Sequence, residues 1–443
     1  MSLEDLALLS RRGRMQIAAF ACAIIFLSIW ASAYFLKPSP PRRIVMATGL
    51  EDGLYHQHAQ RYKAILGRAG IVVEERLTSG AEENLKLLRD PHSGVDIAFT
   101  QGGVATELGE VPNDSIVMLA SLHYEPMWVF YRGAPLRYFN ELLGRRVSNG
   151  VPGSGTRALA NSIFALNEMN SGNVATAPLS NNAAIEALTK GDVDAAIVVG
   201  GAETEAVTKA LREPGIGLLS FGHADAYHRR LPFIVRLSLP SGVIDPGRNL
   251  PPEDVQLIGT KAMLVGRDNL HPALVNLLMD AARDIHGKQG FFEEAGEFPS
   301  TSAVDLPVSA DADRHKRFGA TFLYNYLPFW LAALVERAMV IALPIAAILF
   351  PLFSYLPQFL RWRVRSRVYR WYGELALLER EITTRTGPAP IERWMADLDR
   401  IERAVAGIYT PTEFASEAYT LRQHVDFVRQ AVRERRDEAT QAA

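Results

Sequence analysis

A chain of 443 residues is long enough for two or three folding units, each with a sizeable core. The formal net charge is −2, so the composition lacks the excess of basic residues that marks nucleic-acid binding. Cys22 is the only cysteine, which excludes an intramolecular disulfide and a thiolate metal cluster and leaves no good catalytic cysteine.

An uncharged apolar run, 15–36, follows a short polar N-terminus, 1–14. A helix needs about 20 such residues to cross a bilayer, so we predict a transmembrane helix over 15–36. Arg11, Arg12 and Arg14 precede the run, and this excess of arginine places the N-terminus in the cytoplasm. The alternative is a cleaved signal peptide, because residues 31–33 (ASA) resemble a cleavage site.

A proline-rich linker, 37–43, leads into a region where short β-type runs alternate with helical patterns. Such alternation is typical of parallel α/β units. The phrases GVDIAFTQGG and GDVDAAIVVGG are counterparts in two such series, so we predict two α/β lobes with a ligand cleft near the carboxyl ends of their strands. The first series has strands over 44–48, 71–78 and 95–101 and helices over 55–69 and 81–89; the second has a strand from Arg146, helices over 156–169 and 183–190, and a strand over 193–201.

Small polar residues end the three strands of the first series. From these we select Thr48, Gly49, Ser79 and Gln101 as ligand-binding residues. Glycine lets a ligand approach the backbone, and Thr, Ser and Gln offer neutral hydrogen bonds. Ordinary turn chemistry is the alternative for each residue alone, and Ser79 also fits as the cap of a helix at Ala81.

The sequence GVPGSGTR forms a glycine-rich turn between a strand and a helix of the second series. Backbone N–H groups in such a turn point at an anion, aided by the helix dipole. We predict that Gly153, Ser154, Gly155 and Thr156 hold a carboxylate, while Arg157 either adds positive charge or points to solvent. The turn lacks the lysine of a nucleotide-binding loop, and a proline stands where a nucleophile elbow needs glycine. A purely structural tight turn is the alternative.

Other polar residues give weaker signals. Tyr55 either closes over the ligand or packs in the core, and we include it among the ligand-binding residues. Asn181 and Asn182 precede a helix and fit helix capping. His56 and His58 are two residues apart and so face different sides of a helix, which argues against a metal site. No catalytic constellation stands out, so we predict no enzyme activity, no cofactor and no metal.

The segment 318–337 is largely apolar and aromatic-rich. We predict that it is an interfacial segment, with Tyr324, Tyr326 and Trp330 at the level of the lipid headgroups. A second uncharged run, 338–360, follows, and we predict that it forms a second transmembrane helix.

Five arginines closely follow the second run, so the positive-inside rule places the C-terminus in the cytoplasm as well. The region 44–317 is then periplasmic, and the protein belongs to the bacterial inner membrane. We predict that the cytoplasmic tail, 361–443, forms a small self-packed helical hairpin. The alternative is that it is a docking module for a cytoplasmic partner or a second copy. Its helical patterns cover 368–383, 391–406 and 413–435.

Ordered phrases of the central region resemble the TAXI family of TRAP-transporter solute receptors. The resemblance covers roughly 44–290 and implies the type II periplasmic-binding fold, with a crossover near 128–132 and a return near 233–239. Lobe 1 would then be about 44–131 with 238–317, and lobe 2 about 132–237, with the hinge between them. The phrases are ATGLEDGLYHQHA, LTSGAEENLKLLRD, VDIAFTQGGVA, VSNGVPGSGTRALANSIF, AIEALTKGDVDAAIVVGG and VQLIGTKAMLVGRDNLHPALVNLLMDA.

The chain departs from this family in two respects. Family members are usually exported soluble proteins or lipoproteins, whereas this chain adds a C-terminal membrane helix and a tail. The family's GG-x-YY phrase stands here as Asp52-Gly53-Leu54-Tyr55-His56.

The fold class predicted from these observations is a two-lobed α/β binding domain with a hinge, two transmembrane helices and an α-helical C-terminal tail. The predicted function is capture of a small organic acid, carboxylate-bearing or amino-acid-like, for a TRAP-type secondary transporter whose permease is a possible partner. The alternative is a ligand sensor that signals across the membrane through the tail. An enzyme is the third and weakest hypothesis, because no acid–base or nucleophile set emerges.

Overall fold

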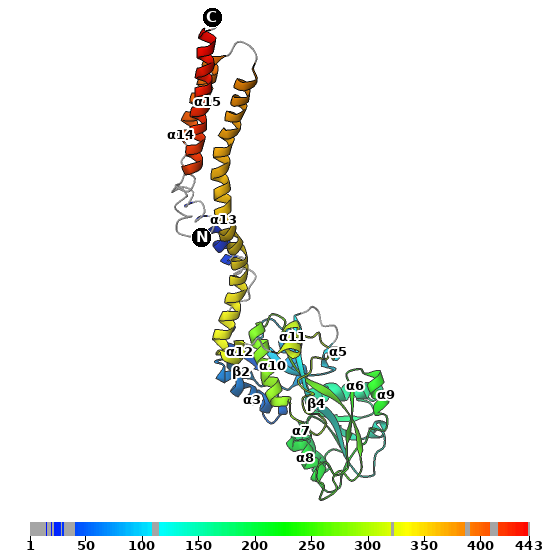
Figure 1. The fold of residues 1–443 in the computed structure, drawn as a ribbon. Coiled ribbons are helices and arrows are strands. Elements are labelled where there is room, and N and C mark those ends of the chain that lie inside the picture. Colours follow the sequence, from blue (N-terminus) through cyan, green and yellow to red (C-terminus); the bar gives the residue numbers. More distant parts are fainter. Residues whose placement is uncertain are drawn as a thin grey trace. The chain divides into compact units, whose positions relative to one another are not determined.

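The computed structural model describes residues 15, 19, 22–27, 29–30, 40–108, 115–319, 323–385, 390–407 and 415–441 (Figure 1). The chain divides into two compact units. One is the α/β unit, Lys37–Glu336, and the other combines Met1–Leu36 with Arg337–Ala443.

The first lobe of the α/β unit is built on three parallel strands. β1 (Arg43–Ala47) pairs with both β2 (Val72–Arg76) and β3 (Ile97–Gln101). Every residue of β3 is buried, as expected for a central strand that is covered on both faces. The lobe's helices are α3 (Leu54–Arg68), α4 (Ala81–Arg89), α5 (Val104–Glu107), α10 (Pro272–His286) and α11 (Ala310–Phe318).

The second lobe repeats the parallel arrangement. β5 (Arg146–Ser148) pairs in parallel with β6 (Ala175–Ala177) and β7 (Ala195–Val199). Two short strands, β8 (Ile216–Leu218) and β9 (Val235–Leu239), complete the lobe. Its helices are α6 (Gly155–Leu166), α7 (Asn181–Lys190), α8 (Glu205–Arg212) and α9 (Ala224–Arg230), with the single 3₁₀ turn Phe139–Leu142.

Two long antiparallel strands join the lobes. β4 (Ile116–Arg132) pairs with β10 (Val255–Arg267) along most of its length and then with β7 of the second lobe. β10 pairs with β9 at its start and with β3 of the first lobe at its end. The resulting sheet has the order β2-β1-β3-β10-β4-β7-β5-β6.

The strand pairings place the two points where the chain passes from one lobe to the other at different residues from those expected from the sequence. The predicted crossover, 128–132, already lies in the part of β4 that pairs with β7 and β8, and the predicted return, 233–239, contains β9, which pairs with the start of β10. The crossings therefore lie nearer the point where Pro126 of β4 faces Gly259 of β10.

The second lobe buries apolar side chains on both faces of its sheet. Met127 and Val129 belong to one apolar cluster, whereas Trp128 and Phe130 belong to another. This alternation follows from the two-residue period of a strand, which sends successive side chains to opposite faces. The first lobe has its own core, in which Tyr62 and Phe99 are fully buried.

The segment predicted to be interfacial begins at α11, continues through α12 (Leu323–Tyr326) and ends in the first turns of α13 (Phe329–Thr384). Tyr326 is exposed. Trp330, in contrast, packs against the core of the first lobe, and the Arg42 guanidinium lies 5.5 Å from its ring centroid. Trp330 is thus partly buried against protein, and the placement of this segment at the headgroup level stays a prediction.

The C-terminal unit contains three helical segments that share one apolar core. They are the end of α13, then α14 (Ile391–Ala406) and α15 (Ala415–Gln441). Trp394 and Leu398 are fully buried against α13 residues such as Leu378. The self-packed helical tail is thus confirmed, with α14 at the predicted bounds.

The structure describes one of the two predicted membrane spans more fully than the other. The first, 15–36, lies largely outside them, and the second, 338–360, falls within α13. In the portions of the chain that the structure describes, no helix is both long enough and apolar enough to cross a membrane.

Candidate functional site

A cavity of about 120 Å³ lies between the two lobes of the α/β unit. The first residues of five helices line it, two from the first lobe and three from the second. The first N–H groups of a helix have no partner within the helix and carry partial positive charge, so convergent helix N-termini favour an anion. These residues are Gly53, Leu54 and Tyr55 of α3; Gly80 and Ala81 of α4; Ser154, Gly155 and Thr156 of α6; Ser180, Asn181 and Asn182 of α7; and Thr204, Glu205 and Ala206 of α8.

Acidic residues line this cavity. Asp52, Glu125 and Glu205 contribute to the wall, and no lysine or arginine is among the described lining residues. Asp52 accepts a hydrogen bond of 2.9 Å from the Asn182 amide of the other lobe. The cavity therefore combines positive helix ends with negative side chains, an arrangement that suits a ligand carrying both charges.

Most of the residues selected from the sequence come together at this cavity. The lining includes Gly49, Tyr55, Ser79, Gln101, Ser154, Gly155 and Thr156.

Thr48, Gly153 and Arg157 do not line the cavity, and each has another partner. The Thr48 hydroxyl donates to Glu75 at 2.9 Å. The Gly153 carbonyl accepts two backbone N–H groups at the start of α4, each at 3.1 Å. The Arg157 guanidinium donates to the Gly150 carbonyl at 3.1 Å, which ties it to its own turn.

Polar side chains of the glycine-rich turn form hydrogen bonds within the protein. The Ser154 hydroxyl accepts the Arg157 N–H at 3.2 Å, as an N-cap does, and donates to the Val151 carbonyl at 2.7 Å. The Thr156 hydroxyl lies 3.3 Å from the Asn181 side-chain oxygen. Both hydroxyls that were expected to hold a carboxylate are thus engaged, so anion binding at this turn would fall to its backbone N–H groups.

Direct hydrogen bonds join the two lobes beside the cavity. Besides the bonds of Gly153 to α4, the Gln101 amide donates to the Gly155 carbonyl at 3.2 Å. The lobes approach closely at Gly155, because a Cβ there would meet Gln101 Oε1 and would lie 3.0 Å from Gln101 Cδ and 3.2 Å from Ala81 Cβ. The constraint on this position is therefore close approach and not an unusual backbone angle.

Glu125 is a lining residue that the sequence analysis missed. It lies on β4 beside Pro126, is 5% exposed, and its Oε2 is 3.1 Å from the Tyr55 hydroxyl. Burial raises the pKa of Glu125 to about 8, against the opposing effect of the Tyr55 hydrogen bond. The Tyr55 hydroxyl also lies 3.1 Å from the Thr100 carbonyl, so it has two acceptors within reach, this carbonyl and the Glu125 carboxyl group.

Tyr55 combines both roles considered for it. Its ring stacks on Phe99, with centroids 5.3 Å apart, and it also contributes to the cavity wall. The sequence signal that could have revealed Glu125 is a lone acidic residue within a long, largely apolar strand.

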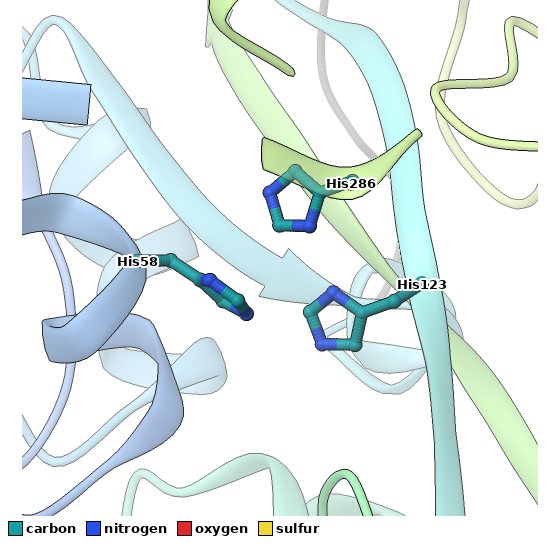
Figure 2. Close-up of side chains that lie close together, drawn as sticks. All are labelled: His58, His123 and His286. Atoms are coloured by element: carbon teal, nitrogen blue, oxygen red, sulfur yellow. The ribbon is translucent and has the colours of Figure 1, made fainter. Parts of the chain in front are cut away.

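Three histidines gather at a second cavity of about 270 Å³ in the same unit. Figure 2 shows the rings of His58 from α3, His123 from β4 and His286 from the end of α10 turned toward one another. Their ligand nitrogens all lie within 4.8 Å of one another. His56 faces elsewhere and lies 2.7 Å from Glu75, so the two neighbouring histidines do face different sides of α3, as predicted.

Burial governs the protonation of this cluster. It lowers the pKa of His123 to about 4. Burial, and then the neighbouring His123, lower the pKa of His58 well below its usual value. Burial and the other two histidines do the same to the pKa of His286.

The two lobes, the shared sheet and the cavity between the lobes define a periplasmic-binding-protein type II-like domain, a solute-binding-protein-like fold that is typically non-catalytic. Residues 46–286 match the model of the NMT1-like family, and the chain belongs to this family.

Solved structures of binding proteins and effector domains also resemble the chain. The periplasmic aliphatic sulphonate binding protein SsuA from Escherichia coli is 13% identical, with a TM-score of 0.36, and the match covers 56% of this chain and 73% of that one. The BenM effector binding domain with benzoate is 13% identical, with a TM-score of 0.37 and coverages of 58% and 97%. An ancestral arginine-binding protein bound to arginine is 12% identical, with a TM-score of 0.36 and coverages of 55% and 92%.

Proposed function

We propose that this protein captures a small organic acid for a TRAP-type secondary transporter, as the resemblance to the TAXI family implies. The observation that carries the proposal is the convergence of five helix N-termini on one cavity between the lobes. Helix N-termini bind carboxylates through backbone N–H groups and the helix dipole. The acid's carboxylate lies at the start of α6, α7 or α8, where the second lobe supplies three such ends.

The acidic wall points to an amino-acid-like ligand within this class. A ligand with only negative charge would meet Asp52 and Glu205 without a compensating lysine or arginine among the described lining residues. An ammonium group beside those carboxylates removes the repulsion. The cavity of about 120 Å³ fits a small molecule, since a cavity of about 150 Å³ holds benzene.

A thermal-shift screen of the full chain against small amino acids, monocarboxylates and dicarboxylates tests this function. An acid present at about 100 times its Kd should add about 2.7 kcal/mol to the free energy of unfolding. We expect stabilisation by an amino-acid-like acid in the parent and none in Gly155→Val, whose side chain blocks lobe closure. A screen in which no acid stabilises the parent would contradict the proposal.

We further propose that the α/β unit is periplasmic and that both termini are cytoplasmic, in a bacterial inner membrane. The support is the uncharged run 338–360, the arginines that follow it, and the exposure of large apolar side chains on α13, including Leu343, Phe350 and Tyr355. Reporter fusions at Gly172 and Ala443 test this topology. A periplasmic signal at Ala443 would contradict it.

A sensor that signals through the tail is the second candidate. The observation in its favour is that α13 runs without a break from Phe329 to Thr384 and forms part of the apolar core of the tail. Hydrogen exchange of the full chain separates the two functions. Altered protection of α14 and α15 when the acid binds would favour sensing, whereas unchanged protection there would favour transport.

A further inference from the structure

We propose that His58, His123 and His286 form a binding site for a divalent transition-metal ion such as zinc. This inference is independent of the solute proposed for the cavity between the lobes. It revises the expectation of no metal, which considered only His56 and His58, two residues apart on one helix.

The fold brings the three histidines together from distant parts of the chain. α3 and α10 lie side by side on the first lobe (Figure 1), and β4 runs beside them through the sheet. The ligand nitrogens lie within 4.8 Å of one another. Two nitrogens that each lie about 2.1 Å from one zinc ion are at most about 4.2 Å apart, so side-chain shifts of about 1 Å would complete the site.

The ring nitrogens of this cluster lack the partners that buried polar atoms normally have. Both nitrogens of His58, both of His123 and Nε2 of His286 are buried without a hydrogen bond in the described structure. Leaving such a group unpaired in the interior destabilises the folded state, because the group loses its hydrogen bonds to water. Aromatic packing explains the ring contacts, whose centroids are 4.6–5.4 Å apart, but phenylalanine would pack equally well without this cost. A metal ion gives three of these nitrogens a partner.

The donor set indicates the class of metal. Imidazole nitrogens suit zinc, copper, nickel and iron, whereas calcium and magnesium prefer oxygen. Three histidines leave at least one coordination position, which would face the adjoining cavity. The wall of that cavity also carries Glu203 and Glu293.

The proposed metal site adjoins the solute cavity through β4. Glu125 Oε1 lies 3.9 Å from His123 Nε2, and Glu125 also lines the cavity between the lobes. The second lobe contributes Glu203 to the wall of the histidine cavity, so the site lies where the lobes meet.

Zinc titration of the full chain tests the site directly. The protein is purified through a tag without histidine, stripped with a chelator and titrated with zinc chloride by calorimetry, with elemental analysis of the dialysed sample. We expect about one zinc ion per chain. His123→Ala should weaken zinc binding by more than about 100-fold, because even the loss of an outer partner costs up to that factor. His56→Ala, from the same helix as His58, is the matched control and should bind like the parent.

Two aromatic variants distinguish the loss of a metal ligand from a loss of folding. His58→Phe and His286→Phe keep ring packing in the cluster but remove a ligand nitrogen. Without metal, both should retain the circular dichroism of the parent; with zinc, only the parent and His56→Ala should gain thermal stability. Cobalt(II) should give the parent the visible absorption of tetrahedral coordination by nitrogen. The proposal is overturned if the parent shows no saturable zinc binding, if the cluster variants bind zinc like the parent, or if the cobalt spectrum is absent.

Discussion

Placing a side chain at Gly155 should weaken solute binding by holding the lobes apart. Gly155 is the first residue of α6, so alanine fits its helical backbone and is the better helix former. Its Cβ, however, would lie 3.0 Å from Gln101 Cδ and 3.2 Å from Ala81 Cβ of the other lobe. Gly155→Ala therefore penalises the closed arrangement without unfolding either lobe.

The size of the effect follows from two costs in the closed state. Forcing extra atoms into a packed contact costs about 1–3 kcal/mol. Losing the 3.2 Å hydrogen bond from Gln101 to the Gly155 carbonyl costs about 0.5–1.5 kcal/mol. The sum of about 1.5–4.5 kcal/mol corresponds to about 10-fold to 10³-fold weaker binding.

Titration calorimetry with the acid found in the screen measures this change on the full chain. Gly67→Ala is the matched control, because Gly67 is also helical and a Cβ there would meet nothing within 4 Å. Parent-like affinity in Gly155→Ala would refute closure at this contact. An equal loss in Gly67→Ala would show that the effect is not specific to the interface.

Three further changes probe the cavity wall, the turn and the tail. Burial raises the pKa of Glu125 from 4.5 to about 8, so the contribution of this residue to stability is complete below about pH 4.5 and is lost as the pH rises through 8. In the presence of a chelator, the melting temperature of Glu125→Gln should therefore rise relative to that of the parent between these two pH values. A difference in melting temperature that stays constant over this range would contradict the burial of Glu125. Ser154→Ala removes the N-cap of α6 and should lower the free energy of unfolding, measured in urea, by about 1 kcal/mol. It should weaken acid binding less than Gly155→Ala does. A larger loss of binding would show that the Ser154 hydroxyl contacts the ligand. Trp394→Ala opens the tail core at a cost of about 3–5 kcal/mol, so limited proteolysis should cut α14 and α15 faster, and unchanged resistance would contradict the packing.

Local patterns in the sequence predict five strands and four helices of the α/β unit. The helix expected over 81–89 has those bounds, and the strand expected over 95–101 is found at Ile97–Gln101. These elements are readable because apolar periodicity and flanking glycines act over a few residues. The same locality explains why strand ends such as Gly49 and Gln101 could be assigned to the cavity wall.

Features that depend on distant pairing could not be predicted in the same way. The crossings of β4 and β10 depend on which strands they pair with, and no local pattern encodes that choice. The sequence also gives no sign of the histidine cluster, because its members are far apart in the chain and only the fold brings together His58, His123 and His286. Ser154 shows a different limit: its position suggests anion binding and helix capping equally, and only the observed hydrogen bonds show that the hydroxyl caps α6.

The central claim is that helix N-termini at the cavity between the lobes recognise a carboxylate. The most direct test compares, by titration calorimetry on the full chain, the best acid from the screen with its primary amide, which has nearly the same shape but no negative charge. Hydrogen bonds to a charged group contribute about 1.5–3 kcal/mol each, so with two such bonds the amide should bind at least about 100-fold more weakly. An amide that binds as tightly as the acid would contradict recognition of the carboxylate by these helix ends.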